Sequence, residues 1–378
     1  MRHTFQHLVI VTFLAGLSWL GNAQAQTVAT DPVGAISLTF KGSSDTFVSL
    51  PFHRPVALET QVQSISGNVV TVSAAANLTA SQFAPAVDGQ PTNYLQFTTG
   101  NRQGMFYTIT SNDGTTITLD PNGDVGLSGN VSSGDTFQVI PYWTLNTLFP
   151  NGQGVNGSPG TSPSSRNSVI LFPDNVTPGI NLSAASSYYY FNGTTNGGVG
   201  WRKVGGSVQT ITNDFVLYPD NCYIVRNSIP GDTQSVLVGA VPMTTFATPL
   251  STRGNNTSQD IFIGFAIPST TTLAGSNLVG SGAFVGSPST SPSLRNDQLL
   301  VFDNTTPTIN RSAFATYYYY NGTNNGGPGW RQVSGNVSVI HDSDPIFQPG
   351  NGFIIRKKAT PTPQPLIWTA VPTYLATP

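Results

Sequence analysis

The stretch Tyr188-Tyr189-Tyr190-Phe191-Asn192-Gly193, followed by Gly200-Trp201-Arg202, decides the architecture of this chain. The same pattern returns 317 − 188 = 129 residues later as Tyr317-Tyr318-Tyr319-Tyr320-Asn321-Gly322, followed by Gly329-Trp330-Arg331. Each copy begins with aromatic residues, which favour strands, and passes through an Asn- and Gly-rich loop, which favours turns, into a Trp-Arg pair. The repeat therefore predicts two related β-modules.

The similarity between the modules extends beyond the aromatic runs. Gly157-Ser158-Pro159 matches Gly286-Ser287-Pro288, and one extra residue near Asn351 changes the offset from 129 to 130 for the segments that follow it. A fainter match joins Asp45-Thr46-Phe47-Val48 to Asp260-Ile261-Phe262-Ile263, with an offset of 260 − 45 = 215. Because 215 − 129 = 86, the first module carries about 86 residues that the second lacks.

These offsets predict a domain organisation. We expect a first β-module at residues 26–250, with an inserted small β-subdomain at about 56–140, and a second β-module at residues 251–378. Within the insertion, residues 62–72 predict a hairpin around Gly67-Asn68, and residues 105–119 predict a second hairpin. Only residues 74–86 could hold a short helix. The predicted fold class is all-β, with two related sandwich- or barrel-like modules, the first carrying an inserted small β-barrel.

The first 25 residues have the pattern of a secretory signal peptide. Arg2 supplies a positive start, residues 8–20 are almost entirely apolar, and Ala23-Gln24-Ala25 resembles a cleavage site. The alternative is a membrane anchor, but the apolar run is shorter than the roughly 20 residues that a spanning helix needs. We therefore expect an exported protein, extracellular or periplasmic, that begins at Gln26 and has no membrane span after signal removal.

The composition excludes several classes of partner and fold. Only 8% of the residues are charged, with 15 Lys and Arg against 17 Asp and Glu, so no basic stripe is available for nucleic acid. Strong helix formers are scarce, and Glu59 is the single glutamate. Cys222 is the single cysteine, which excludes an intrachain disulfide. We expect it to be a buried apolar residue, with a reactive thiol as the alternative.

The chain resembles an uncharacterised family of secreted, β-rich bacterial proteins known from Verrucomicrobia-like genomes. The resemblance rests on residues 46–55, on Pro141-Tyr142-Trp143-Thr144-Leu145 and on the duplicated Tyr-Tyr-Tyr…Trp-Arg hairpin, and it covers most of the chain after residue 25. The loop before Trp-Arg is usually shorter in that family than residues 194–200 are here. The resemblance implies a secreted β-architecture, and it implies no catalytic residue because the family has no established activity.

The aromatic runs are the best candidates for a binding site. Tyr188 and Tyr190 share one face of a strand, with Trp201 nearby on the returning strand. Tyr317, Tyr319 and Trp330 would repeat the arrangement, and such rows of rings stack well on the faces of sugars. The alternative is cross-strand packing that simply holds each hairpin inside its module. Arg202 and Arg331 are expected to make cation–π or carboxylate contacts within the fold.

No metal or cofactor site is expected. Asp120-Pro121-Asn122-Gly123-Asp124 places oxygen ligands at alternate positions, but Val125 and Val131 stand where an EF-hand requires Gly and Glu. A polar turn explains the segment. The two histidines that follow the signal segment, His53 and His341, lie far from each other and from Cys222, so a zinc site is not expected either.

Catalysis has few candidates. Neither histidine has a counterpart in the other module, so a serine- or cysteine-type centre is not indicated. A glycosidase with two carboxylates stays open, because the separation of Asp residues in space cannot be obtained from the sequence. The acids matched between the modules, Asp45/Asp260 and Asp174/Asp303, lie in turn-like contexts where capping would explain them.

These observations favour a non-enzymatic protein with a structural, adhesive or glycan-contacting role at the cell envelope or outside the cell. Its partners would be glycans or other envelope components. One alternative is a secreted polysaccharide-acting hydrolase, and another is a subunit of a surface layer or fibre, which would have unsealed strand edges. The oligomeric state is not indicated.

Overall fold

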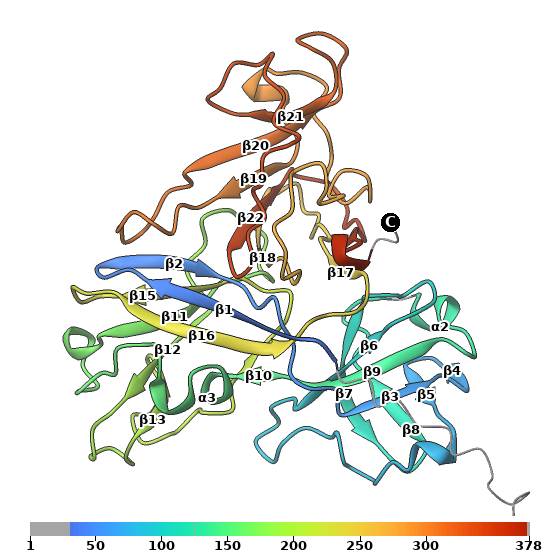
Figure 1. The fold of residues 1–378 in the computed structure, drawn as a ribbon, viewed down its shortest axis with the longest axis vertical. Helices are drawn as coiled ribbons and strands as arrows, with labels where there is room; N and C mark the ends of the chain where they lie inside the picture. Colours follow the sequence, from blue (N-terminus) through green and yellow to red (C-terminus); the bar gives the residue numbers. More distant parts are fainter. Residues whose placement is uncertain (1–30, 125, 376–378) are drawn as a thin grey trace, which may run out of the picture. The chain divides into compact units, whose positions relative to one another are not determined.

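The computed structural model describes residues 31–124 and 126–375, and these are built mainly from antiparallel strands (Figure 1). The all-β prediction is confirmed. In these two ranges the helices are single turns at α2 (Leu127–Asn130) and α3 (Leu145–Leu148) and five short 3₁₀ segments. The helix expected within 74–86 is one 3₁₀ turn at Ala74–Ala76. Within the described ranges, no helix is long and apolar enough to cross a membrane. The expected signal peptide lies outside them.

Both modules contain a five-stranded sheet with the same strand order. In the first module the order is β13 (Gly200–Lys203), β12 (Ser186–Phe191), β11 (Ser168–Phe172), β15 (Tyr223–Asn227) and β2 (Ser44–Val48). In the second it is β21 (Gly329–Gln332), β20 (Ala315–Tyr320), β19 (Gln298–Val301), β22 (Gly352–Lys357) and β18 (Gln259–Gly264) (Figure 1). The two aromatic runs and the two Trp-Arg segments therefore occupy equivalent strands.

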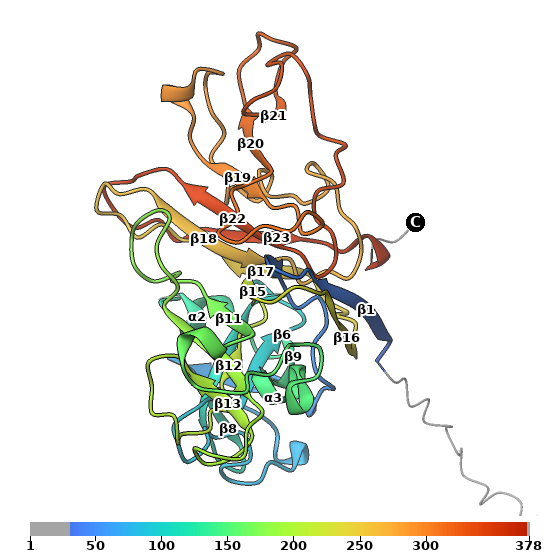
Figure 2. The ribbon, with the colours of Figure 1, turned by 90° about the vertical axis from the view of Figure 1, so that its left-hand side faces the viewer.

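A two-stranded ribbon accompanies each five-stranded sheet. In the first module β1 (Val33–Phe40) pairs with β16 (Thr233–Ala240), as Figure 2 shows. In the second, β17 (Phe246–Pro249) pairs with β23 (Ile367–Ala370). A further short pair joins β10 (Trp143–Thr144) to β14 (Val216–Leu217). Because β17 hydrogen-bonds to the end of the second module, the boundary placed at 250/251 falls after a strand that already belongs to that module.

Residues 58–141, named the insert below, form a sheet of their own. Its seven strands lie in the order β3 (Leu58–Gln61), β9 (Thr136–Pro141), β6 (Asn93–Phe97), β7 (Phe106–Asn112), β8 (Thr116–Leu119), β5 (Val69–Thr71) and β4 (Ser64–Ser66). Both predicted hairpins are confirmed. The two-residue turn of the first places Gly67 at φ +60°, which glycine adopts at little cost. The insert also has a separate apolar core that includes Leu95, Ile109 and Phe137.

The arginine of each Trp-Arg pair organises the Asn/Gly loop that precedes it. The side chain of Arg202 is fully buried and donates hydrogen bonds to the carbonyls of Asn196, Gly198, Trp201 and Val208 at 2.6–3.1 Å. The equivalent arginine of the second module makes the same four contacts at 2.6–3.2 Å. The guanidinium has five donors in a fixed plane, so one side chain can hold a loop that has few backbone bonds of its own.

The two modules contact each other through equivalent residues. Asn304 accepts a hydrogen bond from the backbone N–H of Phe47 in β2 (3.0 Å) and donates one to its carbonyl (2.9 Å). Asn175 makes the same pair of bonds with Phe262 in β18, both at 2.8 Å. The loop after β11 thus closes the edge strand of the second module, and the loop after β19 closes the edge strand of the first. Closed edges are protected from pairing with other chains.

Two buried carboxylates reinforce this interface. Asp45 accepts hydrogen bonds from Arg226 of its own module at 2.7 and 2.8 Å and from a backbone N–H of the second module at 2.8 Å. Asp260 is held in the same way by Arg356 and by a backbone N–H of the first module. The expectation that these two acids bond within turns is therefore wrong, because both lie in strands and join the modules.

Cys222 and Gly352 lie at the centre of the interface. They are equivalent positions, since 222 + 130 = 352, and a Cβ atom added to Gly352 would lie 2.1 Å from the Cys222 sulfur. The stacked rings of Phe47 and Phe302, with centroids 3.7 Å apart, belong to the same buried cluster. The modules therefore pack about an approximate two-fold axis, as the two subunits of a symmetric dimer do.

Candidate functional site

The aromatic residues proposed as a glycan platform do not form an exposed row. They belong to the cores of the two modules. The buried members are Tyr188, Tyr190, Trp201, Tyr317 and Trp330, and Tyr319 is half-buried. The rings of Tyr190 and Trp201 meet edge to face at 5.6 Å, and those of Tyr319 and Trp330 do so at 5.8 Å.

The opposite face of the aromatic strand is covered as well. Arg166 lies over the ring of Tyr189 at 5.0 Å, and Arg202 lies over the ring of Phe191 at 5.8 Å. Both aromatic side chains are 1% exposed. With one face in the core and the other under arginine side chains, this strand has no ring face for a ligand, so the expected platform is corrected to a packing role.

A different candidate site lies where residues of the insert, the first module and the second module converge. This cleft has a volume of about 360 Å³, which is within the usual range of small-molecule sites. It is lined by Phe106, Tyr107, Thr108, Asp120 and Asn122 of the insert, by Asn175, Val176, Tyr218, Asp220 and Asn221 of the first module, and by Pro249, Ser251, Arg253, Gln259, Ile261 and Ile263 of the second. We refer to it as the three-part cleft.

An aromatic ladder holds the insert against the first module at the cleft. The ring of Tyr142 lies 4.9 Å from that of Tyr94 and 5.3 Å from that of Tyr218, and Tyr94 meets Phe106 edge to face at 5.4 Å. The Tyr142 hydroxyl and the Thr108 hydroxyl share a hydrogen bond of 2.7 Å. Tyr94 and Tyr142 are buried, and they hold the rings at the two ends of the ladder in place. Of these end rings, Phe106 is half-buried and Tyr218 is 37% exposed.

The turn that contributes Asp120 is shaped by local hydrogen bonds. The Asp120 carboxylate accepts the backbone N–H of Asn122 at 2.9 Å, and Asn122 has a φ of +46°. Asp124, at the other end of the turn, is occupied by Arg102 at 2.7 and 2.8 Å and by the Tyr107 hydroxyl at 2.7 Å. These bonds fit the polar turn expected from the sequence. In residues 31–124 and 126–375 no group of three His, Cys, Asp or Glu residues could hold a metal ion.

Asp220 is the second carboxylate of the cleft lining. It is half-buried, and burial raises the pKa of its carboxyl above the usual value, although the hydrogen bond from the Thr248 hydroxyl (2.7 Å) partly offsets this. Burial also raises the pKa of the neighbouring Tyr218, and the charges of Asp120 and Asp220 raise it further. The two carboxylates therefore both lie within electrostatic range of the Tyr218 hydroxyl.

The second module supplies the single basic side chain of the cleft lining, Arg253. Its backbone N–H donates to Gln259 at 2.7 Å, and its guanidinium donates to the carbonyl of Asn175 at 3.1 Å. Gln259 in turn donates to the carbonyl of Ser251 at 3.2 Å. Arg253 is exposed, so its remaining donors face solvent. This wall can offer hydrogen bonds to a polar ligand.

The approximate two-fold axis places a second groove at the equivalent position of the other module. This open groove has a volume of about 370 Å³ and includes Asn304 and Asn351, the counterparts of Asn175 and Asn221. Gly350 stands there in place of Asp220, since 220 + 130 = 350, and the insert contributes no residue to it. The repeat therefore supplies the groove twice. The carboxylates of Asp120 and Asp220 and the insert rings of Phe106 and Tyr107 are additions found in the three-part cleft alone of the two.

The sequence predicts only a turn at Asp120 and Asn122, and it does not point to Phe106, Tyr218, Asp220 or Arg253 as residues of a site. One feature of the sequence could have pointed to Asp220. The second module has Gly350 at the equivalent position, so the repeat fold does not need an acid there. Comparison with known proteins found no family model, no curated protein and no solved structure that matches this chain.

Proposed function

We propose that this protein is an exported, non-enzymatic binding protein that holds a neutral polysaccharide in the three-part cleft. The observation that carries the proposal is the composition of the lining. Two partly exposed rings, Phe106 and Tyr218, stand beside carboxylate, amide and guanidinium groups. Ring faces suit the apolar C–H faces of a sugar, and the polar groups suit its hydroxyls.

The charge of the cleft favours a neutral ligand over an acidic one. Its lining has two carboxylates, Asp120 and Asp220, and one guanidinium, Arg253. A uronate or sulfated chain would meet a net negative charge, and like charges brought close together cost several kcal/mol. An adjoining pocket of about 80 Å³ shares five lining residues with the cleft, Phe106 and Pro249 among them, and adds the apolar side chains of Met105, Pro365 and Ile367.

The test is a binding measurement on soluble polysaccharides. Neutral glucans, xylans and mannans would be compared with alginate and polygalacturonate by affinity electrophoresis and calorimetry. We expect binding to at least one neutral polymer and none to the acidic ones. Tyr218→Ala should weaken binding about tenfold, which corresponds to ~1.4 kcal/mol.

A matched control lies in the open groove. Lys41 lines that groove and is partly exposed, so Lys41→Ala should leave binding unchanged. No binding to any neutral polymer, or equal loss in the Lys41 and Tyr218 variants, would contradict the proposal. Fractionation of the producing cells tests export separately: the protein should be found in the periplasm or the medium.

Polysaccharide hydrolysis is the second candidate function, and one observation favours it. Asp220 has a raised pKa, as a general acid requires, and Asp120 lines the same cleft as an exposed carboxylate. An enzyme would release reducing ends from the polymer it binds, and Asp220→Asn would abolish the release. A pure binding protein would keep the polymer intact, and Asp220→Asn would change affinity only.

A further inference from the structure

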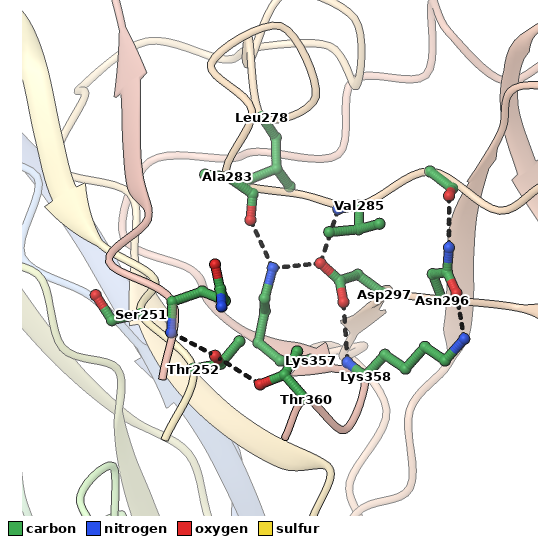
Figure 3. Close-up of polar contacts among 12 residues, drawn as sticks. Ser251, Thr252, Leu278, Ala283, Val285, Asn296, Asp297, Lys357, Lys358 and Thr360 are labelled. Atoms are coloured by element: carbon green, nitrogen blue, oxygen red, sulfur yellow. Dashed lines mark hydrogen bonds and ion pairs between the residues drawn. The ribbon is translucent and has the colours of Figure 1, made fainter. Parts of the chain in front are cut away.

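The second module contains a buried ion pair that the three-part cleft does not use. Lys357 is the last residue of β22, and Asp297 directly precedes β19, the neighbouring strand. The Lys357 ammonium contacts the Asp297 carboxylate, and both side chains are 1% exposed. Figure 3 shows the Lys357 nitrogen between this carboxylate and the carbonyl of Ala283, to which it donates at 2.6 Å.

Two backbone N–H groups hold the Asp297 carboxylate in place. Val285 donates to Oδ2 at 2.8 Å, and Lys358 donates to Oδ1 at 2.9 Å. Preorganised backbone donors of this kind stabilise negative charge that develops on a carboxyl oxygen during attack at its carbon. The buried amine therefore faces a carboxyl group whose orientation is fixed (Figure 3).

The first module shows that the fold does not need charge at this place. Asn227 stands at the position of Lys357 (227 + 130 = 357) and Ser168 at that of Asp297 (168 + 129 = 297). The backbone N–H of Asn156 donates to the Ser168 hydroxyl at 3.0 Å, as that of Val285 does to Asp297. A buried ion pair also costs desolvation that neutral groups avoid. Stability alone thus gives no reason for the charged pair in the second module.

We propose that Lys357 and Asp297 form a covalent isopeptide bond. In the first step, one proton passes from the Lys357 ammonium to the Asp297 carboxylate that it contacts, which gives an amine and a carboxylic acid. The Nζ lone pair then attacks Cγ of Asp297, a C–N bond forms, and the C–O bond to the protonated oxygen breaks. One oxygen and two Nζ protons leave as water, and no oxidant or other reactant is needed.

The bond would close a loop across adjacent strands of one sheet. Asp297 and Lys357 are 60 residues apart in the chain. A cross-link between them would keep β19 and β22 together even in the unfolded state, as a disulfide does in other exported proteins. This chain has one cysteine and cannot form an intrachain disulfide.

The test is mass spectrometry of the folded wild-type protein after tryptic digestion. We expect a branched peptide in which residues 296–311 are joined to residues 357–358, with a mass lower than the sum of the two by one water. The branched species should survive boiling in detergent and reductant. Recovery of an unmodified 296–311 peptide from aged, folded protein, with no branched species, would show a static ion pair and overturn the proposal.

Three variants make the chemistry specific. Asp297→Asn should form the same bond with loss of ammonia instead of water. Lys357→Arg retains a positive charge beside Asp297 but cannot form the amide, so it should give only the linear peptide. The double change Lys357→Asn with Asp297→Ser installs the pair of the first module; it should fold and show no branched peptide. A branched peptide in either of the last two variants would place the bond elsewhere and refute the assignment.

Discussion

Replacing Arg202 by Ala should destabilise the first module by about 2–4 kcal/mol and loosen the loop at residues 192–200. Arg202 donates four hydrogen bonds to backbone carbonyls at 2.6–3.1 Å from a fully buried position. A bond to a charged group contributes about 1.5–3 kcal/mol, so four independent bonds would contribute about 6–12 kcal/mol in total. The loop is largely exposed, however, and its carbonyls can regain water, which lowers the expected cost to ~2–4 kcal/mol.

The measurement is urea unfolding of the full chain, with hydrogen exchange of the loop recorded in parallel. Arg202→Lys should lose most of the same stability, because one ammonium cannot reach four carbonyls spread around a planar group. Arg331→Ala in the second module should cost a similar amount. Lys203→Ala is the control: Lys203 is the exposed neighbour and should change stability by less than about 0.5 kcal/mol. A loss below about 1 kcal/mol for Arg202→Ala, with unchanged exchange in the loop, would refute the reasoning.

Three further predictions concern the module interface and the cleft. Asn304→Ala and Asn175→Ala should each lower the free energy of unfolding, measured with denaturant, by about 1–3 kcal/mol, because each leaves a backbone N–H and C=O of an edge strand unpaired. Strongly unequal losses in the two variants would argue against the two-fold relation. Gly352→Cys should destabilise the protein by about 1–3 kcal/mol, because the new side chain overpacks against Cys222. Adding Cys222→Gly should restore the melting temperature, since the two residues then exchange places across the axis; a double variant that stays destabilised would contradict this. The raised pKa of Asp220 means that the folded state binds its proton more tightly, so stability falls as pH rises from the ordinary pKa to the folded one. Asp220→Asn should therefore raise the melting temperature at pH 7 but not at pH 3, and an equal effect at both would contradict it.

The fold could be predicted from the sequence because its signals are local. Short strands, turn residues such as Gly67, and the repeat around Trp201 and Trp330 each act within a few residues or recur in register. The repeat then implied that both copies fold alike, and the equal strand order of the two sheets follows that expectation. The family resemblance, the signal peptide and export stay predictions.

The site could not be predicted because it depends on contacts between distant segments. Whether Tyr189 faces solvent is decided by Arg166, which lies in a loop before the preceding strand. Phe106, Tyr218 and Arg253 line one cleft although more than 30 residues separate each from the next. The alternation of side chains along a strand does not specify which of its two faces a loop will cover. The aromatic strand was therefore predicted correctly, but the exposed row of rings on it was not.

The exchange of loops between the modules has a consequence for how this molecule could diversify. In an association of two identical chains, every substitution appears on both sides of the axis, and assembly depends on protein concentration. Fusion into a single polypeptide removes both constraints. One copy could then accept an extra domain over its groove and the acid at Asp220, while the other kept Gly350 and an uncovered surface.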